Sequence, residues 1–218
     1  MAHTEVSSRD NYITLSREGF ASLTEKRSVF HAFAAPAVNE AQINDHITAI
    51  KRKYPDAVHH VYAWIIGGDT LRNKYSDDGE PSGTAGLPVL DALRKRNIED
   101  AVVIVTRYFG GTLLGTGGLV RAYSNACVFA IDKAVPVTMI RSMVYEVITD
   151  YHDFEIIRQA VKEMQVELSD AVYGSSVSFC LSVPYNLTEK VISSINDATC
   201  GRALLNFRET GYVRSPVS

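Results

Sequence analysis

Apolar and polar residues follow two different periods along this chain, and the period changes several times between strand and helix. Alternation of polar with apolar residues, and short runs that are apolar throughout, indicate strands in the first part of the chain. Strands are predicted at residues 26–35, 57–66 and 101–106. Apolar residues that return every three or four positions predict helices between them. Helices are predicted after residue 39, at 86–96 and at 117–133.

The same kind of pattern starts again near Val137 and gives a second set of elements. Strands are predicted at 143–149, 166–172, 176–183 and 203–212. Asp153 is the expected cap of a helix that runs through Met164, and Asn186 with Glu189 has the spacing of a capping box before a second helix. The resulting order βαββαβ is that of a ferredoxin-like sandwich.

These patterns predict an α+β protein made of two α/β sandwich domains, residues 1–137 and 138–218. A chain of 218 residues is long enough for two domains of about 100 residues each. Near the first helix, Asn39 and Gln42 also have capping-box spacing. The chain has no apolar run of membrane-spanning length and its first residues do not resemble a signal peptide.

The cysteine content and the charge balance restrict the expected cellular compartment and the class of binding partner. The three cysteines are widely spaced and odd in number, which fits neither a zinc cluster nor a disulfide framework, so we expect a reducing cytoplasmic location. Cys127 falls on the apolar face of a predicted helix and is expected to be a buried thiol. Residues 1–137 carry 15 Lys+Arg and 15 Asp+Glu. This balance excludes a strongly basic nucleic-acid-binding body, so RNA would have to be bound by a local patch, and there is no DNA-binding signature.

Ten of the fourteen glycines lie between Gly67 and Gly118. Because glycine loses the most backbone freedom on folding, such a density requires positive φ angles, tight turns or close approach to the backbone. We therefore look for function in the run from Asp77 to Asn125.

Three carboxylates stand within four residues of this run, at Asp77, Asp78 and Glu80. Carboxylates with water and phosphate are the ligands of Mg²⁺, so a magnesium site is one interpretation. A solvated turn is the other, since Asp, Gly and Pro favour turns. Ser82 and Thr84 follow where a helix begins, and we expect a helix cap there, or a ligand contact, rather than a nucleophile.

A second group follows the apolar strand and combines an arginine with aromatic residues and glycines. Its members are Arg107, Tyr108, Phe109, Gly110 and Gly111. A lone arginine is seldom buried without a partner, so one interpretation is an exposed ligand-binding platform. The other pairs Arg107 with one of the three carboxylates in a structural ion network.

A third group opens the next helix with Gly115, Gly117 and Gly118, and Arg121 lies one turn further on. Free amides at a helix start, with glycines that allow close approach, form an anion site, and Arg121 can add a charged hydrogen bond. The spacing matches neither the Walker A motif nor the dinucleotide fingerprint. His59 and His60 are neighbours in a predicted strand and therefore point to opposite faces, which argues against a shared metal.

The two long motifs DDGEPSGTAGLPVL and VTRYFGGTLLGTGGLVRAYSNA together resemble the IMPACT/YigZ family. The resemblance implies that the N-terminal domain has a β-α-β fold like the second domain of a small-subunit ribosomal protein. It also implies that the C-terminal domain resembles one from elongation factor G. Eukaryotic members of the family regulate translation through an extra N-terminal domain, for which the stretch before Tyr12 is too short.

The resemblance and the residues together favour a binding protein over an enzyme. The expected function is translation- or ribosome-associated regulation, in which the glycine-rich Arg-aromatic face binds RNA, a nucleotide or a translation-related protein. We expect RNA binding to depend on Arg107 and Arg121. The alternative is a magnesium-dependent enzyme acting on a phosphorylated small molecule or nucleotide. A third interpretation is a plain protein-docking surface. No cofactor other than Mg²⁺ is expected, and no membrane partner.

Overall fold

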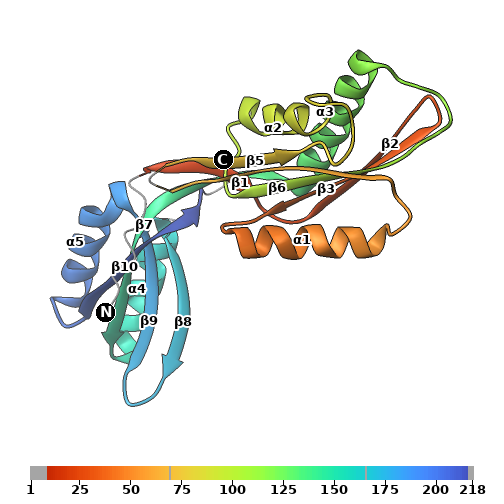
Figure 1. The fold of residues 1–218 in the computed structure, drawn as a ribbon. Coiled ribbons are helices and arrows are strands. Elements are labelled where there is room, and N and C mark those ends of the chain that lie inside the picture. Colours follow the sequence, from red (N-terminus) through yellow and green to blue (C-terminus); the bar gives the residue numbers. More distant parts are fainter. Residues whose placement is uncertain (1–8, 69, 165, 216–218) are drawn as a thin grey trace. The chain divides into compact units, whose positions relative to one another are not determined.

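The chain forms two compact units, each with a sheet and packed helices (Figure 1). The computed structural model describes residues 9–68, 70–164 and 166–215. One unit is Tyr12–Thr138, and the other is Met139–Ser218 with the segment up to Asn11. Within that second unit Arg141 N donates to the backbone oxygen of Asp10 at 2.8 Å, although the sequence assigns residue 10 to the first domain. The α+β class is confirmed, and the division into domains at 1–137 and 138–218 stays a prediction.

The first unit has an antiparallel sheet in the order β2-β3-β6-β4-β5. Its strands are β2 (Gly19–Glu25), β3 (Ser28–Pro36), β4 (His59–Ile66), β5 (Arg72–Ser76) and β6 (Ala101–Tyr108). A short strand, β1 (Asn11–Leu15), precedes them and is not part of this sheet. Because β3 and β4 both pair antiparallel with β6, they run parallel to each other on its two sides. The helix that joins them completes the predicted β-α-β unit.

Three helices cover this sheet, and they confirm the three predicted from apolar spacing. They are α1 (Glu40–Lys53), α2 (Gly86–Lys95) and α3 (Thr116–Ala134). Figure 1 shows α2 and α3 on one face and α1 on the other. At the start of α1, Asn39 Oδ1 accepts a hydrogen bond from Gln42 N at 2.9 Å, and Gln42 Oε1 accepts one from Val38 N at 3.0 Å. The predicted cap is therefore present.

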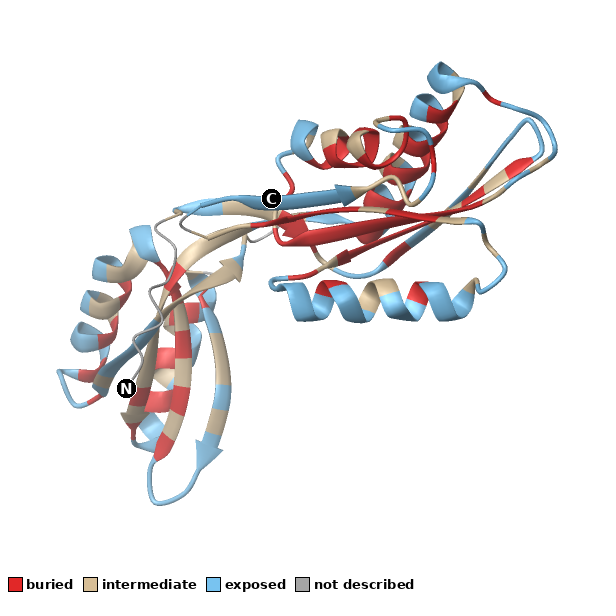
Figure 2. Ribbon diagram, in the orientation of Figure 1, coloured by how far each residue is buried: buried red, intermediate tan, exposed pale blue. Residues whose placement is uncertain are grey.

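The central strand β6 is buried on both faces, which explains its continuous apolar sequence (Figure 2). Val103 and Val105 pack toward α2 and α3, in a core that also contains Leu93. Val102 and Ile104 pack in the second core, toward α1. Residues in β6 therefore alternate between two hydrophobic layers.

The second unit has the predicted ferredoxin-like order of elements. They are β7 (Pro136–Thr149), α4 (Tyr151–Glu163), β8 (Glu167–Tyr173), β9 (Val177–Pro184), the 3₁₀ turn η1 (Tyr185–Leu187), α5 (Thr188–Thr199) and β10 (Leu204–Arg214). Strands β8, β9, β7 and β10 lie in that order in a five-stranded sheet, and the core of the unit includes Phe154, Ile157 and Phe179. No helix in the part of the chain that the structure describes is long and apolar enough to span a membrane.

Both helix starts in this unit differ from the prediction. Asp150, not Asp153, caps α4, because its Oδ1 accepts from Asp153 N at 2.8 Å. The buried Asp153 carboxylate instead accepts two hydrogen bonds from Arg202, at 2.9 and 2.7 Å. Asn186 lies inside η1, so the chain turns before α5 without a side-chain cap and the predicted capping box is wrong.

Candidate functional site

Most of the candidate residues gather at one end of the sheet in the first unit. The β2–β3 hairpin ends there, β6 delivers Arg107, and the loop from Phe109 to Gly115 leads into α3. Arg107 lies in register with Phe30 of β3 on one side and His59 of β4 on the other. Its side chain therefore points to the α2–α3 face of the sheet.

Arg107 is buried and belongs to an ion pair inside the protein. Its Nη1 donates to Glu80 Oε1 at 2.6 Å, and its Nη2 donates to Ser28 Oγ at 3.2 Å. The Arg107 residue is only 5% exposed. Of the two interpretations, the structural ion pair is confirmed, and an exposed platform that includes this side chain is wrong. A buried guanidinium requires a buried counter-charge, and Glu80 supplies it.

Tyr123 and His59 complete this polar cluster. The Tyr123 hydroxyl donates to Glu80 Oε1 at 2.8 Å. Burial, and then the negative charge of Glu80, raise the pKa of Tyr123, which keeps its hydroxyl protonated as a donor. His59 Nδ1 lies 2.7 Å from the backbone oxygen of Asp78, and its Nε2 lies 3.9 Å from Glu80 Oε1. The first contact orients the ring, because a carbonyl oxygen can only accept.

The three carboxylates proposed as magnesium ligands are used by the protein itself. Asp77 accepts hydrogen bonds from three backbone amides at the start of α2, those of Gly83, Ala85 and Gly86, at 2.8–3.1 Å. Asp78 Oδ2 accepts from His60 N at 2.6 Å, and Glu80 faces Arg107. Within the described residues no three His, Cys, Asp or Glu side chains are placed to hold a metal ion. The structure thus corrects the magnesium interpretation.

Ser82 and Thr84 do not cap α2 with their side chains. Thr84 is buried, and its Oγ1 donates to the backbone oxygen of Pro81 at 2.6 Å, whereas Ser82 is exposed. The capping carboxylate is that of Asp77, which stands several residues before the helix. Sequence reasoning missed this role because the usual cap signal is read directly before the first turn.

The glycines in the loop before α3 allow close packing and backbone angles that other residues rarely adopt. A Cβ on Gly110 would overlap the backbone of Arg27 at the hairpin tip. Gly110 N also donates to Ser28 Oγ at 3.2 Å, which ties the loop to the hairpin. Gly111 and Gly115 have φ of +79° and +70°, a region that L side chains rarely adopt. Two of the three reasons expected from the glycine density, positive φ angles and close approach to the backbone, are therefore present.

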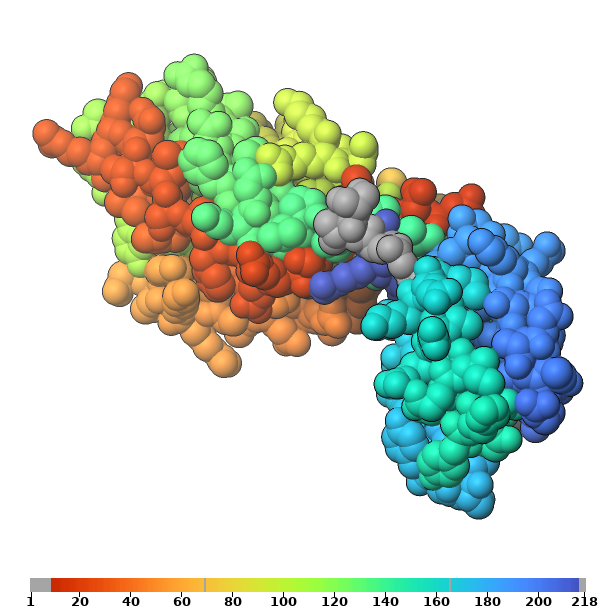
Figure 3. Space-filling model, turned by 180° about the vertical axis from the view of Figure 1, so that it is seen from behind, coloured from red at the N-terminus to blue at the C-terminus, as the bar shows by residue number. Residues whose placement is uncertain are grey.

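Exposed cations and apolar side chains surround the start of α3. Phe109 is 53% and Leu113 is 82% exposed. Lys26 and Arg121 line one hollow of about 110 Å³, together with Gly118, Asn125 and Glu25. Figure 3 shows the hairpin (red) beside α3 (green). We refer to the five side chains of Lys26, Arg27, Phe109, Leu113 and Arg121 as the hairpin–loop face.

The two hairpin cations were not among the candidate ligand residues. Lys26 and Arg27 occupy the two-residue turn between β2 and β3, with φ of +45° and +69°. Both angles are positive, as in a type I′ turn, which usually carries Asn-Gly or Asp-Gly. The sequence therefore gives no turn signal there, and only the fold brings the pair to Arg121.

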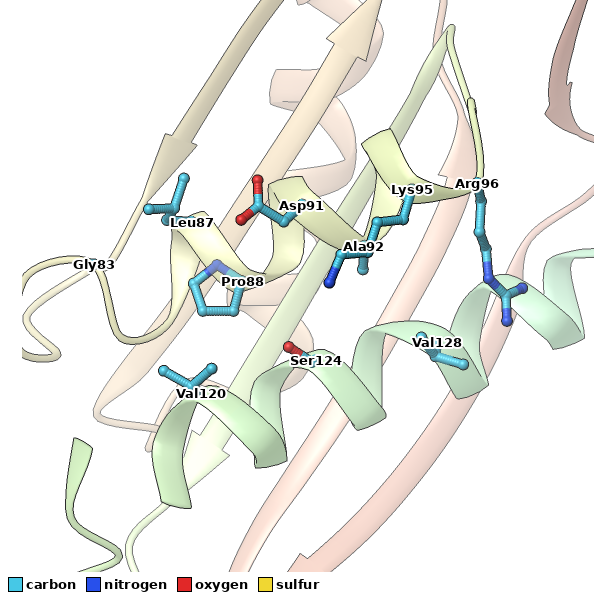
Figure 4. Close-up of a pocket in the computed structure, with 10 residues that line it drawn as sticks. All are labelled: Gly83, Leu87, Pro88, Asp91, Ala92, Lys95, Arg96, Val120, Ser124 and Val128. Carbon is cyan, nitrogen blue, oxygen red and sulfur yellow. The ribbon is translucent and has the colours of Figure 1, made fainter. Parts of the chain in front are cut away.

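A separate groove of about 390 Å³ runs between α2 and α3 (Figure 4). Its walls are mainly apolar and include Leu87, Pro88 and Val120, with Asp91 and Lys95 at its edge. None of the candidate site residues lines it.

Comparison with known proteins gives consistent matches. Residues 26–131 match the model of the Impact N-terminal domain. An IMPACT family member of Haemophilus influenzae is 34% identical over 164 residues, 74% of this chain and 80% of the relative. The IMPACT family member YvyE of Bacillus subtilis is 30% identical over 95% of this chain and 96% of its own. A crystal structure of a hypothetical protein superposes with a TM-score of 0.60 at 26% identity, covering 92% of this chain and 98% of that chain.

Proposed function

This chain belongs to the IMPACT family, which is linked to the regulation of translation, and we propose that it is a translation-associated regulatory protein that binds RNA. The contact surface is the hairpin–loop face, and binding is not coupled to catalysis.

The observation that carries the proposal is the group of three cations at the start of α3. Lys26, Arg27 and Arg121 are exposed, and among the described residues none of them has an ion-pair partner. The first amides of a 19-residue helix lie beside them and favour an anion. Phosphate groups of RNA have the charge that this arrangement attracts.

Two features favour RNA over a small phosphorylated ligand. The cations are spread over a hairpin and a helix instead of converging on one pocket, and the hollow that two of them line holds only about 110 Å³. Phe109 and Leu113 add apolar surface of the kind on which bases pack. The enzyme alternative requires Mg²⁺ bound by Asp77, Asp78 and Glu80. The first two carboxylates accept hydrogen bonds from backbone amides, and the third pairs with Arg107.

Arg107 has a different role in this proposal from the one expected from the sequence. It does not contact RNA but positions the face, because it holds Ser28, and Ser28 Oγ accepts from Gly110 N. The loop and the hairpin tip are thereby held together.

Fluorescence anisotropy with a labelled single-stranded RNA at several salt concentrations tests the proposal. The variant Lys26→Gln/Arg27→Gln/Arg121→Gln should bind more weakly. Its slope of log K against log salt should be less negative by about 2, because three phosphate contacts are lost. The matched control Lys74→Gln/Lys95→Gln/Lys190→Gln removes the same charge from other exposed sites. Equal effects of the two triple variants, or no binding by the unmodified protein, would contradict the proposal.

A further inference from the structure

Aromatic rings gather on the α1 side of the sheet, outside the site described above. His31 of β3 stacks on Tyr54, the residue that ends α1, with ring centroids 4.9 Å apart and planes 5° apart. Tyr108 of β6 meets both rings edge-on, at 6.0 and 6.5 Å. All three residues are partly exposed.

The sheet around these rings is not covered by α1. Phe20 is 46% exposed, and Ser22 and Thr24, which follow it on the same face of β2, are exposed as well. Figure 3 shows this edge of the sheet (red) beside α1 (orange) at the surface. Phe20, His31, Tyr54 and Tyr108 are called the aromatic platform below.

The end of α1 beside the platform is basic, and one of its cations contacts two of the rings. Lys51, Arg52 and Lys53 form the exposed last turn of α1. Lys53 Nζ is 4.4 Å from the ring centroid of Phe20 and 5.5 Å from that of Tyr54. Exposed rings with flexible cations beside them are the combination that binds single-stranded nucleic acids, since bases stack on the rings and phosphates contact the cations.

His31 behaves as an uncharged ring in this setting. Burial, and then the charge of Lys53, lower its pKa, and its Nδ1 lies 2.8 Å from Ser22 Oγ. A neutral imidazole adds a flat surface without a fixed charge. Duplex RNA keeps its bases stacked inside, so only unpaired bases can use such a surface.

The platform lies on the α1 face of the sheet, and Phe109 lies on the opposite face, against Arg107. The two surfaces meet at the end of β6 and the hairpin tip, where Tyr108 pairs in register with Val29, two residues after Arg27. We propose that the aromatic platform stacks unpaired bases of a single-stranded RNA whose backbone continues onto the hairpin–loop face. This inference rests on the proposed function and names its substrate as unpaired RNA.

Packing alone does not account for the platform. The helix α1 is already anchored by Ile43 and Ile50 in the core beneath it, which also contains Phe33. Tyr54 packs against the edge of this core, and the Phe20 ring lies 4.9 Å from that of Phe33, yet Phe20 still exposes almost half of its surface.

The test compares two RNA probes of equal length and charge, one with normal bases and one made of abasic nucleotides. The unmodified protein should bind the base-bearing strand more tightly, and a duplex no better than the abasic strand. Tyr54→Leu/Tyr108→Leu should weaken binding of the base-bearing strand by about 5- to 150-fold, the range for lost stacking on one base, and leave the abasic strand and the salt dependence unchanged. Tyr151→Leu/Tyr173→Leu is the matched control, because this stacked pair belongs to the second unit.

The outcomes separate the two proposals. Equal binding of both probes by the unmodified protein overturns base stacking but leaves RNA binding by the hairpin–loop face intact. No binding of either probe overturns both proposals. Binding of a protein partner would then be the remaining explanation for the exposed rings. If the double variant does not fold, as judged by circular dichroism, Phe20→Leu/His31→Gln should give the same selective loss in milder form, and an equal loss on both probes overturns the inference.

Discussion

Arg107 and Glu80 form an ion pair of 2.6 Å in the interior of the first unit, although 27 positions separate them in the sequence. Their side chains are 6% and 4% exposed. A buried charge that loses its partner is left without solvent, so each residue stabilises the fold only in the presence of the other. The pair fixes the end of β6 to the turn that precedes α2.

Glu80→Gln is therefore expected to lower the free energy of unfolding by about 3–5 kcal/mol, because it leaves the Arg107 charge buried and unpaired. Urea denaturation measures this. Glu155→Gln removes an exposed partner of Arg158 and should change stability by less than about 1 kcal/mol. Similarly small changes in the free energy of unfolding for both variants would show that the Arg107 guanidinium becomes solvated when Glu80 is replaced.

Gly110→Ala should destabilise the protein by about 1–3 kcal/mol, since its Cβ would overlap the backbone of Arg27 and force the loop away from the hairpin. Gly117→Ala is the control in the same segment. Its Cβ would approach only Arg121 Nη1, at 3.8 Å, and alanine favours a helix, so stability should rise by up to about 1 kcal/mol. Thermal melts of both variants check the difference in sign.

Asp77→Ala should cost about 1–2 kcal/mol, because three amides at the start of α2 lose their acceptor. Ser82→Ala changes a neighbouring exposed residue and should stay within about 0.5 kcal/mol. Added Mg²⁺ should not raise the melting temperature of the unmodified protein through these carboxylates. A magnesium-dependent rise that Asp77→Ala abolishes would restore the metal interpretation.

Cys127 and Cys200 should differ strongly in their reaction with a thiol reagent at pH 8. Burial raises the pKa of the Cys127 thiol to about 12, whereas Cys200 is exposed at the end of α5. Because the thiolate is the reactive form, Cys200 should be labelled rapidly and Cys127 only after unfolding. Mass spectrometry of the labelled peptides distinguishes the sites.

Stability should fall as the pH drops below about 6.5, the ordinary histidine pKa. Burial is the main cause that lowers the pKa of both His31 and His60 in the folded protein. The unfolded chain then binds more protons, so the neutral rings contribute stability that is present above pH 6.5 and lost toward the lower folded pKa values. In urea titrations, His31→Gln should reduce the change in the free energy of unfolding between pH 7.5 and 5.5. An unchanged slope would contradict this assignment.

Local periodicity was sufficient to locate most elements. The alternation in residues 26–35 and the apolar run 101–106 correspond to β3 and β6, and the spacing after Asn39 corresponds to α1. The βαββαβ order followed from the same signals. Such patterns are readable in one dimension because strand and helix periods depend only on neighbouring residues. Caps were less certain, as Asp153 shows, because two nearby aspartates compete for one position.

The partners of charged side chains were decided by the tertiary structure. In the sequence Asp77, Asp78 and Glu80 are nearly equivalent, yet one caps α2, one holds β4 and one neutralises Arg107. Strand register and the path of the turn determine which carboxylate reaches which group.

The sequence by itself determined the elements, the fold class and the family resemblance. Only the tertiary structure showed that Arg107 is internal, and that the surface charge at the same end of the sheet comes from Lys26, Arg27 and Arg121. It also brought His31, Tyr54 and Tyr108 together from three elements. The physical reason is that burial and contact depend on strand pairing over long separations, which no local pattern of hydrophobic residues records.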